Sequence, residues 1–263
     1  MDLAANPVRR SGASNYLWRL VATGISFLLF GLGGLVLRLI VLPLLGQLPG
    51  DAVTRRRRAR MAISKAFYLH VQFMSRSAVL EYSFEGSERL GRPGQMIIAN
   101  HPSLIDVVFL IAHIRDANCI VKQSLSRNPF TRGPVCRAQY ISNNGSPEML
   151  GQAADALREG QTLIVFPEGT RTTPDRPPVF HRGAAAMALR GARVITPVFI
   201  TVEPTTLTKA EPWHRIPERR VRVSLRVGKD IAPETFNADA PLPIASRRLN
   251  EYLHQLFMKE LSP

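Results

Sequence analysis

The pattern of apolar and polar positions changes near residue 80. Before that point a long apolar run extends from Tyr16 to about Leu45, and apolar residues then recur at helical spacing from about Asp51 to Leu80. After that point, short β-branched runs alternate with turns and amphipathic segments, a pattern typical of a mixed α/β domain. The sequence therefore predicts a disordered tip over 1–15, a helical anchor with a second helix over 16–80, and an α/β domain over 81–263.

The apolar run is expected to associate with a membrane. No charged side chain occurs over residues 20–37, a length of about 18 residues that lies at the lower limit for crossing a bilayer. Tyr16 and Trp18 at its start have amphipathic rings that favour the headgroup level. Pro43 and the Pro49–Gly50 pair are expected to end the run. No signal-peptide cleavage pattern accompanies it, so we expect the segment to be retained.

The second predicted helix is strongly basic near its beginning. Such a helix can lie along an anionic leaflet, where each basic side chain contributes about 1 kcal/mol of attraction. The alternative is a solvated arginine face on an ordinary helix, and the position directly after the apolar run favours the membrane. We therefore expect a helical hairpin in the membrane interface, with the α/β domain on the cytoplasmic side of the inner membrane. The basic residues are Arg55, Arg56, Arg57, Arg58 and Arg60.

The predicted fold class is α/β, with a central mixed β-sheet flanked by helices and an N-terminal membrane-associated helical hairpin. Short β-branched runs predict strands at Leu80–Glu85, Gln95–Ala99, Asn118–Val121, Thr162–Phe166, Val194–Thr201 and Val221–Val227. Amphipathic periodicity predicts helices at Leu104–Ile114, Pro147–Glu159, His181–Arg190 and Ala245–Glu260.

Composition adds a strong preference for anionic partners. The formal net charge of +14 suits nucleic acid, anionic lipid headgroups or an acidic carrier protein, and charge alone does not choose among them. The two cysteines, Cys119 and Cys136, have no CxxC spacing and suggest neither a disulfide framework nor a thiolate metal site. A reduced cytosolic setting fits this usage best.

A histidine and an aspartate follow the second predicted strand. His101 is placed at the strand end, and Asp106 lies about one turn into the next helix, where its carboxylate can reach back to the imidazole. With an ordinary pKa of about 6.5, a histidine can accept a proton from an alcohol and later return it to a leaving group. The alternative is a histidine at a helix start with a capping aspartate, because this spacing is common by chance.

A second charged turn follows the strand predicted near residue 165. The sequence Phe-Pro-Glu-Gly-Thr-Arg runs from Phe166 to Arg171. Gly169 permits close backbone approach, Arg171 offers a planar fork suited to phosphate, and Glu168 is able to orient either Arg171 or a substrate hydroxyl. A plain turn with a surface ion pair is the alternative.

Together, the two segments resemble the glycerophospholipid acyltransferase family, which includes the 1-acylglycerol-3-phosphate acyltransferases. The first block of that family is met by Asn100, His101 and Asp106, and its third block is matched residue for residue by Phe166–Arg171. The fourth block corresponds to the weaker match Ile195–Val198. The resemblance covers roughly residues 80–230 and implies a glycerol-phosphate-acyltransferase-like fold, with residues 81–263 as the acyltransferase domain.

The resemblance also implies the chemistry and the site. The histidine deprotonates an acceptor hydroxyl, the aspartate supports it, and the hydroxyl attacks an acyl thioester directly without an acyl-enzyme. The donor is acyl-ACP or acyl-CoA, the acceptor is a lysophospholipid-type lipid, and neither a cofactor nor a metal is expected. The catalytic candidates are His101 and Asp106. The substrate-binding candidates are Asn100, Ser103, Lys122, Glu168, Gly169, Thr170 and Arg171.

The second block departs from the family pattern. Its lysine, Pro-Phe pair, glycine and isoleucine can be placed, but the position of its final arginine holds Asn143. An asparagine donates hydrogen bonds without charge, so phosphate attraction at that corner is expected to be weaker. Arg132 or Arg137 is placed to compensate; otherwise the acceptor is another lysolipid, a glycolipid, an amino-acid lipid or a secondary-metabolite lipid.

A non-enzymatic basic protein that binds nucleic acid or anionic lipid is the alternative of a different class. The chain has neither zinc-finger spacing nor the aromatic-basic strand motif of common RNA-binding domains, so we expect no nucleic-acid partner. It also lacks the GxSxG and GxxxxGK[ST] motifs of serine hydrolases and phosphate-loop enzymes. The other histidines, among them His70 and His181, show no metal-ligand spacing and are expected to be ordinary.

Overall fold

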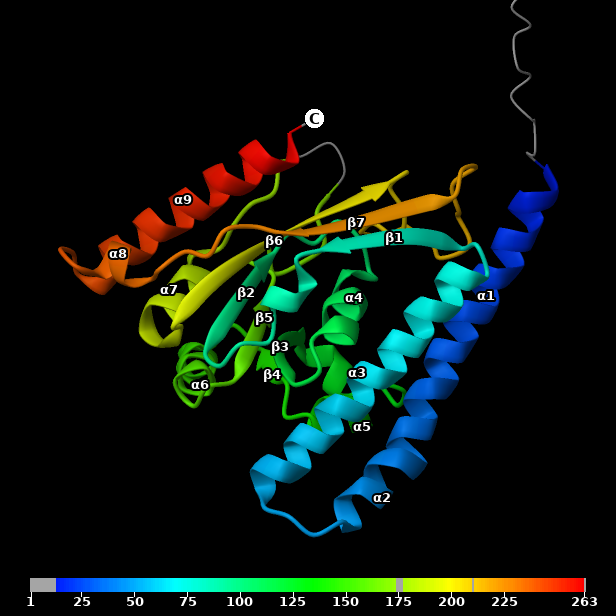
Figure 1. The fold of residues 1–263 in the computed structure, drawn as a ribbon, viewed down its shortest axis with the longest axis horizontal. Coiled ribbons are helices and arrows are strands. Elements are labelled where there is room, and N and C mark those ends of the chain that lie inside the picture. Colours follow the sequence, from blue (N-terminus) through cyan, green and yellow to red (C-terminus); the bar gives the residue numbers. More distant parts are fainter. Residues whose placement is uncertain (1–12, 174–176, 210, 263) are drawn as a thin grey trace, which may run out of the picture.

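The computed structural model describes residues 13–173, 177–209 and 211–262. Within these residues a seven-stranded sheet forms the centre of the molecule (Figure 1). Its strands lie in the order β1-β7-β6-β2-β5-β3-β4, and the β6–β7 pair is antiparallel whereas the other described pairs are parallel. The predicted mixed sheet is thus confirmed. The strands are β1 (Leu80–Glu85), β2 (Gln95–Ala99), β3 (Ala117–Lys122), β4 (Ile141–Asn143), β5 (Thr162–Val165), β6 (Val194–Glu203) and β7 (Val221–Val227).

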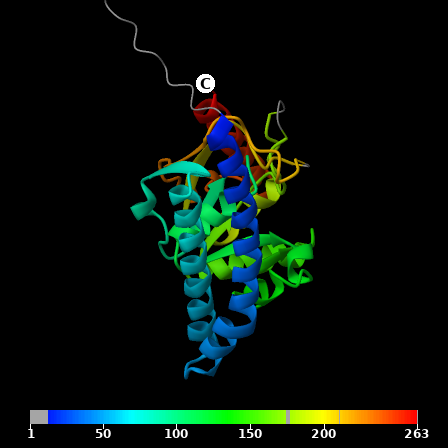
Figure 2. The ribbon, with the colours of Figure 1, turned by 90° about the vertical axis from the view of Figure 1, so that its right-hand side faces the viewer.

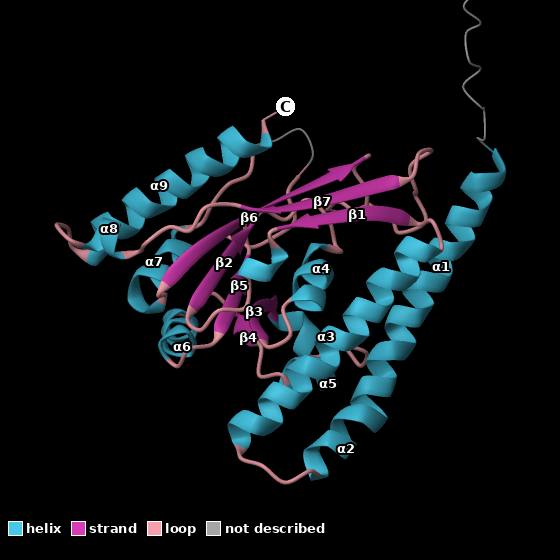
Figure 3. Cartoon of the chain, in the orientation of Figure 1, coloured by secondary structure: helices cyan, strands magenta, loops and turns pink. Residues whose placement is uncertain are grey.

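Helices cover both faces of the sheet, as Figure 3 shows. Because successive strand residues point to opposite faces, Ile97 packs into one core and its neighbours Met96 and Ile98 pack into the other. The first core is closed by α3 (Ala52–Arg76) and α4 (Asp106–His113), and the second by three helices on the opposite face. These three are α6 (Pro147–Arg158), α7 (Arg182–Gly191) and α9 (Leu242–Leu261). Strands buried on both faces explain the continuous apolar runs in the sequence.

The N-terminal segment forms a helical hairpin beside α4. It consists of α1 (Ala13–Val36), a π-helical turn (Leu37–Val41) and α2 (Leu42–Gln47), and α3 runs back alongside α1 (Figure 2). The helix over Asn15–Gln47 has a mean hydropathy of 2.4 and is long and apolar enough to cross a membrane. Its most apolar window is only 17% buried within the protein, so most of its apolar surface faces outwards.

Pro43 does not end the apolar helix, contrary to the prediction. The π-helical turn precedes it, with the Leu42 N–H bonded to the Leu37 carbonyl five residues earlier. The wider π-helical turn accommodates Pro43, which has no N–H to donate, and the helix continues to Gln47. The chain turns at Pro49–Gly50, and Asp51 then caps α3 by accepting a hydrogen bond from the Thr54 N–H at 2.8 Å.

Two further expectations about the N-terminal region need correction. Residues 13–15 of the predicted disordered tip belong to α1, and the remainder of that tip lies outside the described residues. Arg60, expected on a lipid-facing or solvated surface, is 2% exposed and donates to the Ala138 carbonyl and the Gln161 side chain at 2.9 Å each. Its guanidinium therefore ties α3 to the α/β domain.

The elements missed by the sequence patterns are short. They are β4, α5 (Arg132–Arg137), α8 (Glu234–Asn237) and the 3₁₀ turns at Ser87–Arg89 and Gln123–Ser126. Such segments have too few residues to show periodicity, and α5 contains a glycine and a proline that lower helix propensity.

Candidate active site

Three neighbouring parallel strands bring the candidate residues together. β5, β2 and β6 lie side by side in the sheet and run in the same direction. Their carboxyl ends therefore meet at one edge, where β2 leads to His101, β5 leads to Glu168 and β6 leads to the loop with Leu207. The two motifs are far apart in the sequence, and parallel pairing alone places them side by side.

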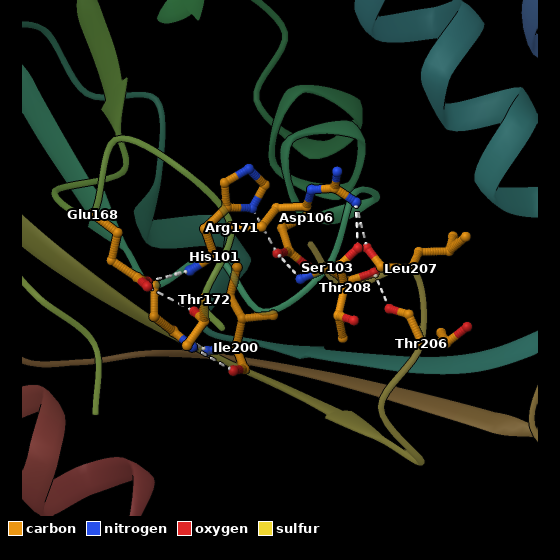
Figure 4. Close-up of polar contacts among 11 residues, drawn as sticks. His101, Ser103, Asp106, Glu168, Arg171, Thr172, Ile200, Thr206, Leu207 and Thr208 are labelled. Atoms are coloured by element: carbon orange, nitrogen blue, oxygen red, sulfur yellow. Dashed lines mark hydrogen bonds and ion pairs between the residues drawn. The ribbon is translucent and has the colours of Figure 1, made fainter. Parts of the chain in front are cut away.

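His101 and Asp106 are in direct contact. The Nδ1 atom of His101 lies 2.9 Å from Oδ2 of Asp106, which is 0% exposed (Figure 4). The same oxygen accepts the backbone N–H of Ser103 at 2.7 Å. A carboxylate that receives Nδ1–H leaves Nε2 of the imidazole as the proton acceptor. Phe166 stacks on the ring, with centroids 4.3 Å apart, and fixes its plane.

Asp106 is held in an environment that resists its charge. Burial raises the pKa of its carboxyl above the ordinary value, whereas the hydrogen bonds from His101 and Ser103 oppose the shift. Its other oxygen, Oδ1, is buried and has no hydrogen-bond partner among the described residues. A nearby positive charge on His101 therefore has a larger stabilising effect here than it would have in water.

Glu168 holds the two motif turns against each other. Its carboxylate accepts the backbone N–H of His101 and the hydroxyl of Thr172, each at 2.8 Å (Figure 4). The backbone N–H of Thr172 also donates to the His101 carbonyl at 2.7 Å. Burial raises the pKa of Glu168, although these two hydrogen bonds to its side chain oppose the shift. The expectation that Glu168 orients Arg171 is therefore wrong, because its carboxylate serves the backbone of His101.

Arg171 reaches the loop after β6 instead. Its Nη1 donates to the carbonyls of Leu207 and Thr208, both at 2.8 Å (Figure 4). Both acceptors are neutral, so no described carboxylate pairs with the charge of the guanidinium. This loop was not predicted as part of the site. It contributes backbone carbonyls, which every residue has, so the sequence does not mark them.

Asn100 and Ser103, expected to bind substrate, have supporting roles in this structure. The Asn100 amide donates to the carbonyl of Ile200 and accepts its N–H, each at 2.8 Å, which fixes the end of β2 to β6. The Ser103 hydroxyl donates to the Thr206 carbonyl at 2.9 Å. Both side chains are buried, so they position the turn that carries His101.

A cavity of about 390 Å³ opens beside the second motif. Its lining includes Glu168, Gly169 and Thr170 together with Asn143 and His181. Gly169 has a φ of +65°, and a Cβ at this position would come within 3.5 Å of the His181 ring. Lys122 is not among the residues that line this cavity; it is exposed at the end of β3, in register with Asn143 of β4.

A separate, mostly apolar cavity of about 300 Å³ lies between the hairpin and the α/β domain. Its walls come from α1, α3 and α4 and from the segment with Leu125 and Phe130. Leu104 and Ile105, within the turn between His101 and Asp106, also line it, so the cavity borders the turn that joins the two catalytic candidates.

The family model described as Acyltransferase matches residues 81–201, a range that contains the His101–Asp106 pair and the second motif. Similar proteins include 1-acyl-sn-glycerol-3-phosphate acyltransferases from Saccharomyces cerevisiae, 28% identical, and Borreliella burgdorferi, 31% identical. These alignments cover 71% and 43% of this chain. These similarities support the resemblance to the glycerophospholipid acyltransferase family that the two motifs indicated.

The extent of the likeness differs between sequence and structure. The chain spans 62% of the Saccharomyces relative and 48% of the Borreliella relative. The crystal structure of the 1-acyl-sn-glycerophosphate acyltransferase PlsC from Thermotoga maritima has a similar fold, with a TM-score of 0.65 at 20% identity. That likeness covers 93% of this chain and 100% of the other, so it includes the helical hairpin as well as the sheet.

Proposed function

We propose that this protein transfers a fatty acyl group from a thioester donor to the hydroxyl of a lysophospholipid-type acceptor similar to 1-acyl-sn-glycerol-3-phosphate. The observation that carries the proposal is the 2.9 Å contact between His101 and the fully buried Asp106, at the edge where both family motifs meet. The named activity of the relatives supports the reaction class.

His101 acts as the general base in this proposal. Its Nε2 takes the proton of the acceptor hydroxyl as the oxygen attacks the thioester carbonyl. The tetrahedral intermediate then collapses, the carbon–sulfur bond breaks, and the imidazolium returns the proton to the leaving thiolate. The products are an ester and a free thiol, and Asp106 stabilises the imidazolium between the two transfers.

The donor is acyl carrier protein or coenzyme A in its acylated form. The apolar cavity next to Leu104 suits the fatty acyl chain, because burial of each CH₂ group contributes about 0.8 kcal/mol. The segment that lines this cavity also presents exposed basic side chains, which complement an acidic carrier protein or the phosphates of coenzyme A. These side chains are Lys122, Arg127, Arg132 and Arg137.

The acceptor headgroup is proposed to bind at the second motif. Arg171 supplies a guanidinium without a carboxylate partner among the described residues, and Gly169 and Thr170 line the adjacent cavity. Asn143 occupies the corner where an arginine is usual in the family, so a glycolipid or amino-acid lipid acceptor is the alternative within the same chemistry.

The hairpin is proposed to hold the domain on the cytoplasmic face of the inner membrane. The outward apolar surface of Asn15–Gln47 supports membrane association. A lipid acceptor and a lipid product both partition into the bilayer, so an anchored enzyme meets them at high local concentration.

The test is thioester consumption by the purified protein, with acylated carrier protein and acyl coenzyme A as donors. Lysophosphatidate, other lysolipids and non-phosphate lipid alcohols serve as acceptors, with the His101→Ala variant as control. We expect transfer to a lysolipid that falls by at least about 10³-fold in the variant. Transfer that persists in His101→Ala contradicts the mechanism, and no transfer to any acceptor leaves a basic lipid-binding protein as the better explanation.

A further inference from the structure

The apolar cavity contains a polar pair that the proposed reaction does not use. Ser26 from α1 and His70 from α3 both line it, with Oγ of Ser26 3.3 Å from Nε2 of His70. Ser26 is only 4% exposed. The neighbouring wall is aromatic and aliphatic: Phe30 packs edge-on against the His70 ring at 5.4 Å, and Phe67 and Met74 lie in the same lining. A hydroxyl and an imidazole are thus present in a wall that is mostly apolar.

The two groups can both donate and accept hydrogen bonds. Burial lowers the pKa of His70 to about 4, so its ring is neutral near pH 7 and has one donor and one acceptor nitrogen. The contact with Ser26 uses one nitrogen, and within the described ranges the ring forms no other hydrogen bond. The Ser26 hydroxyl likewise has capacity beyond this single contact.

The alternative explanation is that the pair is only a hydrogen bond that stabilises the packing of α1 against α3. The two helices already bury apolar side chains between the hairpin and the core, such as Ala22 at 1% and Ile63 at 0% exposure. Polar groups in an apolar wall cost free energy unless they are paired, and one 3.3 Å hydrogen bond satisfies only part of their capacity. A ligand hydroxyl beside the pair would satisfy more of this capacity.

We propose that Ser26 and His70 recognise a hydroxyl group on the acyl chain of the donor, so that the cavity favours a hydroxyacyl thioester over the unsubstituted chain. The hydroxyl binds beside the Ser26–His70 contact and hydrogen-bonds to the capacity that this contact leaves unused on the two side chains. The inference rests on the proposed acyltransferase function and narrows its donor class.

The test is a competition between two donors in one reaction. A series of thioesters of equal chain length, each with a hydroxyl at one position along the chain, competes with the unsubstituted thioester for a fixed lysolipid acceptor. The ratio of the two products gives the selectivity and does not depend on how much of the protein is folded. We expect at least one hydroxyacyl donor to be preferred by about three- to tenfold, the effect of one buried hydrogen bond.

Variants separate recognition from packing. Ser26→Ala and His70→Phe should each reduce the preference to near unity. Ser64→Ala is the matched control, because Ser64 is a buried serine of α3 that donates to the Ala112 carbonyl and is not part of the cavity lining. It should keep the wild-type selectivity.

Two results overturn the inference while leaving the acyltransferase intact. One is a wild-type protein that transfers unsubstituted chains at least as well as every hydroxyacyl chain. The other is a hydroxyacyl preference that survives in Ser26→Ala and His70→Phe. Absence of transfer from all donors is a different outcome, because it removes the proposed function and this inference together.

Discussion

Asp106 stabilises charge on His101 while being fully buried itself. Its Oδ2 accepts two N–H groups, and its Oδ1 has no partner among the described residues. Asparagine is therefore an informative replacement, because its carbonyl oxygen can take the place of Oδ2 and keep both hydrogen bonds. The substitution removes the negative charge that stabilises the imidazolium and leaves the geometry largely unchanged.

We expect Asp106→Asn to lower kcat by about 10²- to 10⁴-fold with little change in the KM of either substrate. Steady-state kinetics over a series of donor and acceptor concentrations measures this. A large rise in KM at unchanged kcat would assign Asp106 to substrate binding instead of to the chemical step.

The same substitution should alter the pH dependence of stability. The pKa of Asp106 is raised in the folded protein above the ordinary 3.8, so the folded state binds its proton more tightly than the unfolded chain does. The stability from this group is therefore complete below about pH 3.8 and is lost as the pH rises through the raised folded value. We expect Asp106→Asn to unfold at a temperature no lower than the wild type near pH 7. A clearly lower thermal unfolding midpoint for Asp106→Asn would contradict the conclusion that burial raises the pKa of this carboxyl.

At the scale of elements, the packing of α1 against the Phe130 segment requires a glycine at position 34 but not at the neighbouring position 33. A Cβ on Gly34 would clash with the backbone carbonyl oxygen of Phe130, whereas a Cβ on Gly33 meets nothing within 4 Å. The two positions are adjacent in α1, so they form a matched pair. Gly34 is therefore where the α1 backbone approaches the segment that lines the apolar cavity.

We expect Gly34→Ala to destabilise the protein by about 1–3 kcal/mol, since backbone must shift to admit the methyl group. Gly33→Ala should be neutral or stabilising by up to about 1 kcal/mol, because alanine favours the helix. Thermal unfolding of both variants in the same detergent measures the difference. Equal midpoints would show that α1 does not approach the Phe130 segment this closely.

The sequence predicted the regular elements better than the contacts between them. The long apolar runs and the Phe166–Arg171 motif predicted the strands β2 and β5 and the turn that follows each. The role of Glu168 was not predictable, because its partner is the backbone N–H of His101, brought near by the pairing of β2 with β5. The burial of Arg60 was hidden for a similar reason, since its acceptors come from residues 138 and 161.

The whole molecule has two contrasting sides. The sheet and its inner helices bury their apolar residues, whereas the segment of α1, the π-helical turn and α2 exposes a series of them along its length. Exposed apolar surface of this extent marks an interaction site in a protein that is otherwise strongly basic. The residues concerned are Leu17, Trp18, Val21, Ile25, Leu28, Leu29, Leu32, Val36, Leu39, Ile40, Leu44 and Leu48.

Membrane binding should therefore depend on side chains that do not line the apolar cavity. Leu28 and Leu39 are 60% and 66% exposed, and neither belongs to the cavity lining. We expect the double variant Leu28→Glu/Leu39→Glu to bind vesicles of mixed anionic composition at least tenfold more weakly, because a buried leucine contributes about 1.5–3 kcal/mol and an inserted carboxylate opposes entry. Vesicle co-sedimentation measures the change. Val179→Glu is the control, since Val179 is 69% exposed beside α9, and it should bind as the wild type does.

Transfer from short-chain donors in detergent separates this effect from misfolding, because the active site and the cavity lining are unchanged in the double variant. Retained transfer together with lost vesicle binding is the expected result. If the double variant binds vesicles as tightly as the wild type, the hairpin is not the anchor. The arginines at the start of α3, of which Arg55 and Arg57 are exposed, would then have to supply the attraction. In that case binding should fall steeply between low and high salt, whereas apolar insertion is insensitive to salt.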